Sequence, residues 1–341
     1  MTQRRLGFLL VVSLAVLVLA VWVVHSQSGA GAADGAGATV LPGLENRLNS
    51  VTEVRISAAG GVHTALRKGA RRWMVSERAY PADSGKLRKL LIDLGNLKIV
   101  ERKTRLAKNY PILGVQAVTS AKASGTRIDV ISPHKTWSLI VGHTANGNGS
   151  YVRVVDHKQS LLVSPLVMAD AKPAQWLDPV IIDVSRSHIS RIEERPARGR
   201  RFSVSRAKAS EADFTVHGVP RGRKLDGPNA ADNMANALSN LTLSDVRKSA
   251  PPPRGTRLSH AVFKTFGGLE IDVDGYQTGK SGKHYIDVVA HGSGKKAGHR
   301  AARINARVHG WQYRIPAYRY REIFQPLSGL LAPLPGRHKK R

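Results

Sequence analysis

Several short motifs in this chain have residue types and spacings that could support chemistry. Gly279-Lys280-Ser281 has the ending of a phosphate-binding loop, in which backbone N–H groups at a helix N-terminus hold a phosphate. Such a loop needs a glycine five positions before its final Gly-Lys-Ser, and Asp274 stands at that position. The residues on both sides have the pattern of strands. The motif therefore predicts a hairpin turn rather than a nucleotide site.

The chain also carries residues that could bind a metal ion. Asp272 and Asp274 are two residues apart, so a strand would place both carboxylates on one face, where a divalent cation could bind. No third ligand stands near them. The densest group of histidines comprises His284, His291, His299 and His309. These lack the His-Glu-x-x-His spacing, and zinc needs three or four convergent ligands, so we expect neither a metal nor a cofactor.

Two further motifs concern catalysis and nucleic acid. The Gly-x-Ser-x-Gly signature is absent, which leaves an envelope hydrolase with scattered triad residues as an alternative. The run from Trp311 to Arg321 interleaves aromatic residues with arginine, as platforms for single-stranded nucleic acid do. A strand from Trp311 to Ile315 followed by a helix explains the same residues as core and rim. We favour that interpretation and expect neither enzymatic activity nor nucleic-acid binding.

Positive charge is the most pronounced chemical property of the chain. Its 53 lysines and arginines exceed its 24 acidic residues and give a formal net charge of +29. A surface of this charge attracts polyanions, among them lipopolysaccharide and anionic lipid. The alternative is that a GC-rich genome encodes arginine often.

Two basic clusters supply the candidate polyanion-binding residues. They are Arg67, Lys68, Arg71 and Arg72 in the first cluster, and Arg195, Arg198, Arg200 and Arg201 in the second. We expect both clusters in equivalent hairpin turns of two repeated units, where they could line one side of the protein. A solvated surface is the alternative. A third basic group comprises Lys295, Lys296, Arg300 and Arg303.

An uncharged apolar run extends from Leu6 to Val24 and follows Arg4 and Arg5. As a helix it would reach roughly 28 Å, close to the hydrocarbon thickness of a bilayer. The positive-inside bias then predicts that residues 1–25 comprise a cytoplasmic N-terminus and a transmembrane anchor that passes once through a bacterial inner membrane. The remainder is expected in the periplasm. A cleaved signal peptide, with small-residue sites such as Ala30-Gly31-Ala32, and a twin-arginine export signal remain alternatives.

The rest of the composition is that of an exported chain whose fold must be stabilised by its own hydrophobic core, without disulfides. There is no cysteine, which excludes disulfides, thiolate chemistry and a lipid-modified N-terminal cysteine. Hydrophobic residues make up 42% of the chain, enough for two domains of ordinary size. The Gly/Ala-rich stretch over 26–43 predicts a flexible linker, and residues 333–341 predict a basic tail.

Hydrophobic spacing predicts strands first and then a helix. Val51 to Ile56 and Trp73 to Val75 have strand patterns separated by glycine turns. Asp83 or Ser84 can cap a helix whose apolar residues are three and four apart. The apolar residues of that face are Leu87, Leu90, Leu91, Leu94 and Leu97. Further strands follow, and a second short helix is expected over 166–176.

The order of these elements starts again near Ile189. The closest local match aligns Leu94-Gly-Asn-Leu97 with Leu238-Ser-Asn-Leu241. A hairpin is expected between Gly268–Val273 and His284–Val289, and a closing helix over 317–331. We therefore expect an α+β fold, with a transmembrane helix before two tandem, duplicated units of mainly antiparallel sheet, each with one or two packed helices. The units are expected over 44–187 and 188–332.

These elements resemble a known family. The chain resembles bacterial domain-of-unknown-function proteins, anchored by one N-terminal helix, that are encoded beside gliding-motility-type (Gld) ABC transporter components. The matching segments are Trp73–Val75, the Tyr80-Pro-Ala-Asp83 turn with its leucine helix, Val141-Gly142, Tyr151-Val-Arg153 and Gln175-Trp-Leu-Asp178. The family's Tyr/Phe-Gly-Leu-Asp segment is present only as Tyr110-Pro-Ile-Leu-Gly114, and strong positive charge is not a mark of the family.

The resemblance implies a non-enzymatic accessory or binding protein of an ABC-type export system, held in the inner membrane through Leu6–Val24 and acting in the periplasm. Its expected partners are the transporter subunits. The first alternative is a protein that binds an envelope polyanion, and the second is an envelope hydrolase. The resemblance assigns no catalytic residues.

Overall fold

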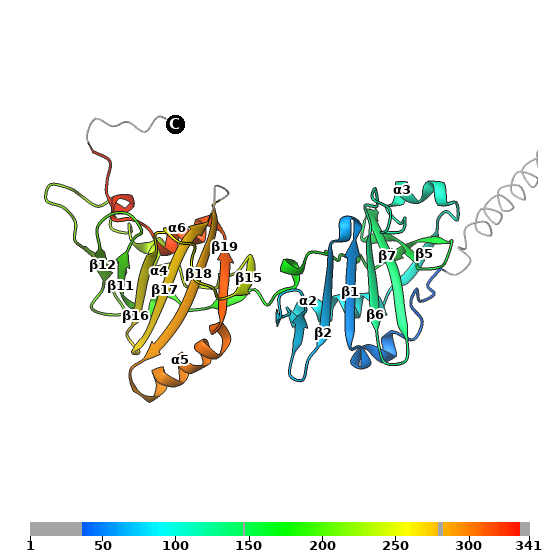
Figure 1. Ribbon diagram of the computed structural model, residues 1–341, viewed down its shortest axis with the longest axis horizontal. Helices are drawn as coiled ribbons and strands as arrows, with labels where there is room; N and C mark the ends of the chain where they lie inside the picture. Colours follow the sequence, from blue (N-terminus) through cyan, green and yellow to red (C-terminus); the bar gives the residue numbers. More distant parts are fainter. Residues whose placement is uncertain (1–35, 146, 279–281, 335–341) are drawn as a thin grey trace, which may run out of the picture. The chain divides into compact units, whose positions relative to one another are not determined.

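The computed structural model describes residues 36–145, 147–278 and 282–334. The chain forms two compact units, Met1–Trp176 and Leu177–Arg341, and each is considered by itself (Figure 1). The expected membrane segment over 6–24, most of the expected linker and the Gly279–Ser281 motif lie outside the described residues.

A nine-stranded antiparallel sheet forms the frame of the first unit. Its strands, in spatial order, are β4 (Tyr80–Pro81), β3 (Trp73–Val75), β2 (His63–Lys68), β1 (Glu53–Ala58), β6 (Thr126–Ile131), β7 (Thr136–Ala145), β8 (Gly149–Val154), β9 (Ser160–Ser164) and β5 (Lys98–Arg102). Apolar residues alternate along these strands, so that Val54 and Ile56 of β1 are fully buried while Arg55 between them is exposed.

The predicted leucine helix is confirmed as α2 (Ser84–Gly95). The side chain of Asp83 accepts a hydrogen bond of 2.9 Å from the N–H of Lys86, which caps its first turn. Its buried residues are Leu87, Leu90, Leu91, Leu94 and Gly95. The other helical elements of this unit are short: η1 (Glu45–Ser50), η2 (Ala59–Gly61), η3 (Ala107–Asn109), α3 (Tyr110–Leu113) and η4 (Pro173–Trp176).

The second unit contains an eight-stranded antiparallel sheet. Its strands, in spatial order, are β13 (Thr215–His217), β12 (Phe202–Ser205), β11 (Ile189–Arg195), β16 (Ser259–Thr265), β17 (Leu269–Thr278), β18 (Lys283–Gly292), β19 (Trp311–Ile315) and β15 (Asp245–Lys248). A small separate sheet pairs β10 (Val180–Ile182) with β14 (Leu241–Thr242). The helical elements are η5 (Arg186–His188), α4 (Asp232–Asn236), α5 (Gly294–Val308), α6 (Ala317–Ile323) and η6 (Leu327–Leu330).

The two large sheets have the same strand order. From β3 to β5, the first sheet follows β3-β2-β1-β6-β7-β8-β9-β5, and the second follows β13-β12-β11-β16-β17-β18-β19-β15. Each strand of the second sheet therefore has one counterpart in the first, and β4 is an addition to the edge of the first sheet. The connection between β18 and β19 contains helix α5, whereas its counterpart between β8 and β9 is the short segment 155–159.

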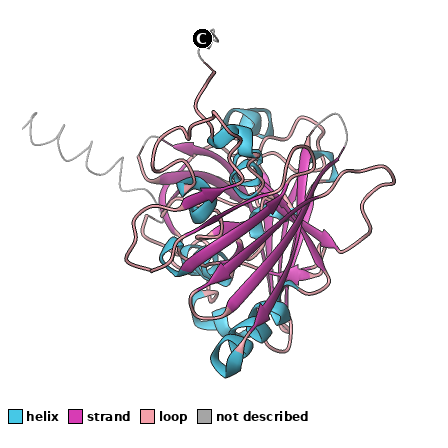
Figure 2. Ribbon diagram, turned by 90° about the vertical axis from the view of Figure 1, so that its left-hand side faces the viewer, coloured by secondary structure: helices cyan, strands magenta, loops and turns pink. Residues whose placement is uncertain are grey.

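The expected fold class, α+β with a transmembrane helix, is wrong for the part of the chain that the structure describes. Antiparallel strands in three sheets dominate it, and of its helices only α2 and α5 are longer than seven residues (Figure 2). Within the described ranges no helix combines the length and the apolar character that crossing a membrane requires.

Two expected helices are shortened by proline. The segment 166–176, expected as a helix, is irregular up to the single turn of η4, because Pro173 inside it has no backbone N–H to donate to a preceding turn. The expected helix over 317–331 is divided into α6 and η6 at Phe324–Pro326 for the same reason.

The units divide after Trp176, and the sequence had suggested a boundary after Ser187.

Candidate functional site

A groove of about 370 Å³ lies on the second unit, over one end of β11 and its neighbours. We call it the basic groove. Its lining consists of Arg191, Glu193, Glu194, Arg195, Arg201, Phe202, Ser203, His217, Gly218, His260 and Val262. Three arginines and two histidines thus face one concave surface that has a single exposed carboxylate, since Glu194 is buried.

Strand register brings these residues together. Arg195 of β11 lies opposite His260 of β16, and Glu193 lies opposite Ser203 of β12. Ser203 in turn lies opposite His217 of β13. Because cross-strand partners project from the same face, residues far apart in the sequence lie side by side in two neighbouring rows across β16, β11, β12 and β13.

The carboxylate of Glu193 is neutralised by its own neighbours. Its Oε1 lies 2.9 Å from Nε of Arg191 and 3.4 Å from Nζ of Lys264. Burial alone would raise the pKa of Glu193, but the hydrogen bond from Arg191 and the charge of Lys264 outweigh burial and hold its pKa below the usual value. In the described part of the chain, neither Arg195 nor Arg201 forms an ion pair with an acidic side chain. The groove therefore keeps an excess of positive charge.

Glu194 does not offset this charge, although it is adjacent to Arg195 in sequence. Its side chain lies in the core and is 2% exposed, and neither carboxylate oxygen has a hydrogen-bond partner. Burial raises the pKa of Glu194 to about 9, so the group is neutral at pH 7. A neutral acid beneath the groove leaves its positive potential intact.

The two acidic residues singled out as a possible cation pair lie beside this groove. Asp272 and Asp274 share one face of β17, as predicted, and contact histidines of the neighbouring strands. Nδ1 of His260 lies 2.8 Å from Asp274, and Nε2 of His291 lies 3.0 Å from Asp272. Across residues 36–145, 147–278 and 282–334, no three or more His, Asp or Glu side chains are arranged to hold a metal ion.

The described residues include two serine–histidine pairs, one in each unit. Oγ of Ser205 lies 2.8 Å from Nε2 of His217, and Oγ of Ser124 lies 3.0 Å from Nε2 of His143. The second ring nitrogen of His143 meets the carbonyl oxygen of Ile112 at 3.2 Å. A triad needs a carboxylate at that nitrogen, and neither histidine has one among the described residues.

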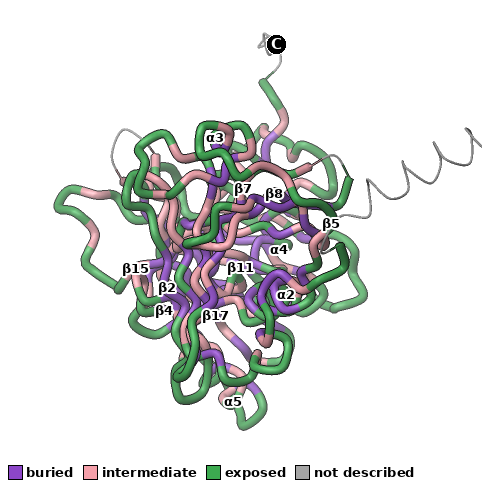
Figure 3. The backbone as a smooth tube through the Cα atoms, turned by 90° about the vertical axis from the view of Figure 1, so that its right-hand side faces the viewer, coloured by how far each residue is buried: buried purple, intermediate pink, exposed green. Residues whose placement is uncertain are grey.

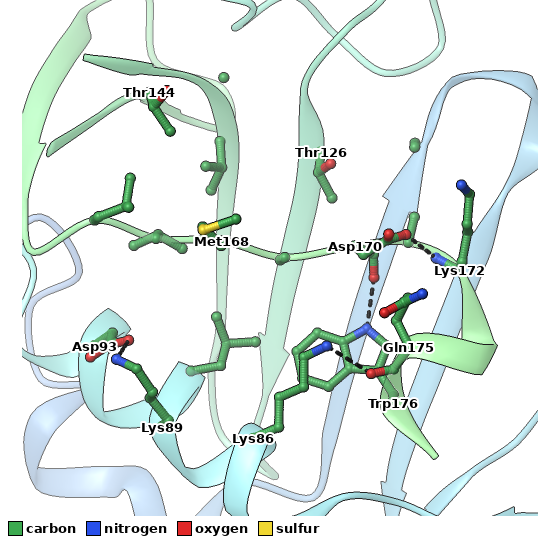
Figure 4. Close-up of a pocket in the computed structure, with 18 of the residues that line it drawn as sticks. Lys86, Lys89, Asp93, Thr126, Thr144, Met168, Asp170, Lys172, Gln175 and Trp176 are labelled. Atoms are coloured by element: carbon green, nitrogen blue, oxygen red, sulfur yellow. Dashed lines mark hydrogen bonds and ion pairs between the residues drawn. The ribbon is translucent and has the colours of Figure 1, made fainter. Parts of the chain in front are cut away.

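The first unit contains a larger groove, of about 950 Å³ (Figure 4). We call it the strap groove, because the irregular segment 165–172 crosses it. Helix α2 supplies Lys86, Lys89, Leu90 and Asp93 to one side, and the ends of β6 and β7 form another. Met168 is 73% exposed, whereas Val167 beside it is buried.

Short-range contacts fix the rim of the strap groove. Nζ of Lys86 donates a hydrogen bond of 2.7 Å to the carbonyl oxygen of Gln175 and lies 4.8 Å from the ring centroid of Trp176. The indole N–H of Trp176 donates to the carbonyl oxygen of Asp170 at 2.7 Å. Lys89 pairs with Asp93 at 2.8 Å. The groove therefore combines apolar walls with polar groups that are already positioned, as binding sites commonly do.

The two predicted basic clusters do not occupy equivalent turns. Arg67, Lys68, Arg71 and Arg72 lie at the β2–β3 turn, whereas the second cluster lies at the β11–β12 turn. The counterpart of the β11–β12 turn is the β1–β2 turn, which lies at the opposite end of the strands from the β2–β3 turn. The expected equivalence is therefore wrong.

The basic groove includes only part of the predicted set. Of the second cluster, Arg195 and Arg201 line the groove, and Arg198 and Arg200 are exposed on the turn above it. In the first cluster, Arg67 lies 3.4 Å from Glu53, and Lys68 donates to the carbonyl oxygen of Asn49 at 3.0 Å. The sequence interpretation did not identify Arg191, His217 or His260. The alternation Arg191-x-Glu193-x-Arg195 was a detectable signal, since a strand places all three on one face.

The aromatic and arginine run over 311–321 forms β19 and α6. Tyr313 and Ile315 are almost completely buried, while Tyr318 and Arg321 are exposed. The run therefore supplies core and rim to the second unit, in agreement with the favoured interpretation.

Each unit is thus a large antiparallel sheet with a surface groove, and the chain is a tandem β-sheet protein. A family model for a domain of unknown function, DUF4340, matches residues 73–259, from the start of β3 to the first residue of β16. The match covers more than half of the chain, and the chain belongs to this family. No curated protein and no solved structure was found to match it.

Proposed function

We propose that this chain is a non-enzymatic binding protein that acts outside the cytoplasm, and that its second unit binds a phosphate-bearing polyanion of the cell envelope, such as lipopolysaccharide. The supporting observation is that Arg195 and Arg201 line one groove and have no acidic partner in the described part of the chain. Guanidinium groups donate two parallel hydrogen bonds to a phosphate or carboxylate, which makes arginine suited to this ligand class.

The experiment measures binding of the full chain to immobilised lipopolysaccharide at several salt concentrations. We expect the Arg195→Gln/Arg201→Gln variant to bind at least about tenfold more weakly, because two unpaired guanidinium groups are lost. Arg254→Gln/Arg257→Gln is the matched control, since both arginines are exposed in the same unit and outside the groove. Equal loss in both variants, or binding that does not respond to salt, contradicts the proposal.

A second candidate function is that of an accessory protein of an ABC-type exporter. It is supported by the resemblance to single-anchor proteins encoded beside gliding-motility-type transporters, and by the strap groove. There, the exposed thioether of Met168 lies among the apolar walls formed by Leu90 and Val167. Methionine adapts to varied partner surfaces, so such a groove suits a segment of a partner protein.

Photocrosslinking in cells tests this second candidate. A photoreactive amino acid at Met168 should capture transporter subunits, identified by mass spectrometry. The same amino acid at Ile112 is the control, because Ile112 is 72% exposed in the same unit and lies outside the strap groove. Capture of no transporter subunit from Met168, or equal capture from Ile112, contradicts this role.

Location outside the cytoplasm is supported by Arg4 and Arg5 before the uncharged run from Leu6 to Val24, since the positive-inside bias then predicts export of the remainder. A C-terminal alkaline phosphatase fusion should be active, because this reporter folds only after export. Activity of a cytoplasmic reporter alone contradicts the proposed location.

A further inference from the structure

Helix α5 carries a row of basic side chains on its outward face. Successive members are one, three or four residues apart, which places them on one side of a helix. We call this row the α5 stripe: Lys296, His299, Arg300, Arg303 and Arg307. The buried residues of the helix, Ala297, Ala301 and Val308, are at other positions of the helical repeat, and Figure 3 shows both exposed and buried stretches along α5. The helix contains no acidic residue.

The helix is held firmly against the sheet. β18 pairs with β19 only through His284–Ile286, so its backbone at Ala290 lacks a neighbouring strand on that side. Asn305 of α5 takes the place of that strand. Its Oδ1 accepts a hydrogen bond of 2.8 Å from the N–H of Ala290, and its Nδ2 donates one of 2.7 Å to the carbonyl oxygen of Ala290. The stripe therefore keeps a fixed orientation relative to the sheet.

Little in the protein neutralises the stripe. In the described part of the chain, one ion pair joins α5 to an acidic side chain, that of Arg307 with Asp178 at 2.7 Å. Lys295 and Lys296 occupy the first turn, where the helix dipole is already positive, and like charges three and four residues apart repel each other. These costs would be relieved by an anionic surface placed against the outward face.

The shape of the stripe distinguishes among anionic partners. It extends about 16 Å along the helix axis from Lys296 to Arg307. The residues between its members include Gly298, Ala302 and Ala306, and the helix carries no Phe, Tyr or Trp to form a stacking platform for bases. The stripe also lies outside the basic groove, so it is a surface separate from that site. A straight row of long cationic side chains over small residues fits a plane of negative charge.

We propose that α5 docks the second unit on the surface of an anionic lipid bilayer, with the helix axis parallel to the membrane plane. The interaction is electrostatic attraction of the stripe by acidic headgroups. The proposal is independent of the basic groove, which uses other residues. It also concerns the second unit alone, because the first unit has no helix between β8 and β9.

The test places a fluorophore on α5 in the full chain. The chain has no cysteine, so Ala302→Cys creates a unique labelling site, and Ser210→Cys provides a label on an exposed loop of the same unit. Vesicles contain phosphatidylcholine with or without about 30 mol% phosphatidylglycerol, and a nitroxide quencher on the headgroups. We expect quenching at position 302 only with the anionic lipid, and little quenching at position 210.

Charge variants then test the stripe itself. Arg300→Gln/Arg303→Gln should weaken docking about 25-fold, at roughly fivefold for each charge near the surface. Glutamine retains helix propensity, and circular dichroism verifies folding. The matched control is Arg254→Gln/Arg257→Gln, which also removes two arginines three residues apart, both of them exposed. It should weaken docking by less than about threefold, as should the groove variant Arg195→Gln/Arg201→Gln.

Three outcomes overturn the proposal. Quenching at position 302 could be insensitive to phosphatidylglycerol or to the stripe variant. The control could lose as much docking as the stripe variant, which would assign the effect to net charge. Finally, the wild type could bind soluble polyphosphate through the stripe, with binding lost in the stripe variant, and yet fail to dock on anionic vesicles. The partner of the stripe would then be a soluble polyanion.

Discussion

Glu194 and Arg195 are neighbours in β11, and their side chains lie on opposite faces of the second sheet. Arg195 is exposed in the basic groove, whereas Glu194 is buried without a hydrogen-bond partner. Alternation along a strand accounts for the separation. Burial raises the pKa of Glu194 to about 9, so the acid nearest to Arg195 in sequence carries no charge at neutral pH.

The first prediction concerns the pH dependence of stability. The unfolded chain releases the Glu194 proton near pH 4.5, whereas the folded chain retains it up to about pH 9. Because the folded state binds more protons in this window, the contribution of Glu194 to the free energy of unfolding is fully present below pH 4.5 and decreases as the pH rises towards 9. Glu194→Gln does not titrate, so it should be more stable than the wild type at pH 8.

Chemical denaturation at several pH values measures this difference. Glu270→Gln is the control, since Glu270 lies on the exposed face of β17 and contacts Lys264. It should preserve the decrease of stability seen in the wild type between pH 4.5 and 9. A Glu194→Gln variant that keeps the wild-type pH profile would show that Glu194 is charged in the folded protein.

The second prediction concerns the charge of the basic groove. Glu193→Gln removes its exposed carboxylate, so lipopolysaccharide should bind about two- to fivefold more tightly at low salt, and the gain should disappear at high salt. Binding measurements at both salt concentrations test this. Glu270→Gln removes the same charge outside the groove and should have a smaller effect. Weaker binding of Glu193→Gln would mean that the pairing of Glu193 with Arg191 organises the site.

The third prediction concerns the packing of α6 on the sheet. A Cβ atom at Gly275 of β17 would overlap the ring of Phe324 and lie 2.9 Å from Cε2 of Tyr320. Gly275→Ala should therefore lower the free energy of unfolding by about 1–3 kcal/mol. Gly267→Ala has open space around its new methyl group and should change stability by less than about 0.5 kcal/mol. Thermal or urea unfolding compares them, and equal stability would contradict the close approach.

The fourth prediction separates structural arginines from binding arginines. Arg206 is 7% exposed, and its guanidinium lies 4.8 Å from the ring centroid of Phe214. It donates to the carbonyl oxygens of Arg186, Ser187, Ile189, Ala209 and Glu211. Arg206→Gln leaves several of these acceptors unpaired and should destabilise the protein by about 2–4 kcal/mol.

The control for Arg206 is its exposed neighbour Lys208. Lys208→Gln should change stability by less than about 0.5 kcal/mol. Folded Arg206→Gln protein, measured below its melting temperature, should bind lipopolysaccharide as the wild type does. A loss of binding without a loss of stability would show that Arg206 is part of the binding surface.

Local patterns in the sequence predicted several elements correctly. The cap at Asp83 and the leucine spacing identified α2, because both depend only on residues within a few turns. The hairpin of β17 and β18 is also confirmed, with Asp272 opposite Val289. In this hairpin, alternating apolar residues on either side of a turn were sufficient to indicate the pairing.

The remaining features depend on contacts between distant residues. His217 and His260 join the basic groove through strand register, which single-sequence patterns do not provide. The burial of Glu194 contradicts the usual location of glutamate, so no composition rule predicts it. The equivalence of the two basic clusters failed because a turn was assigned to the wrong pair of strands, although the turn residues themselves were recognised.

The different lengths of the β8–β9 and β18–β19 connections have a consequence for how this architecture diversifies. The same junction accommodates a tight reversal in one unit and an entire helix in the other, and the strand order is preserved in both. This junction is therefore a natural insertion point. A new recognition element can be added there in one copy, by evolution or by a protein engineer, while the other copy stays unchanged.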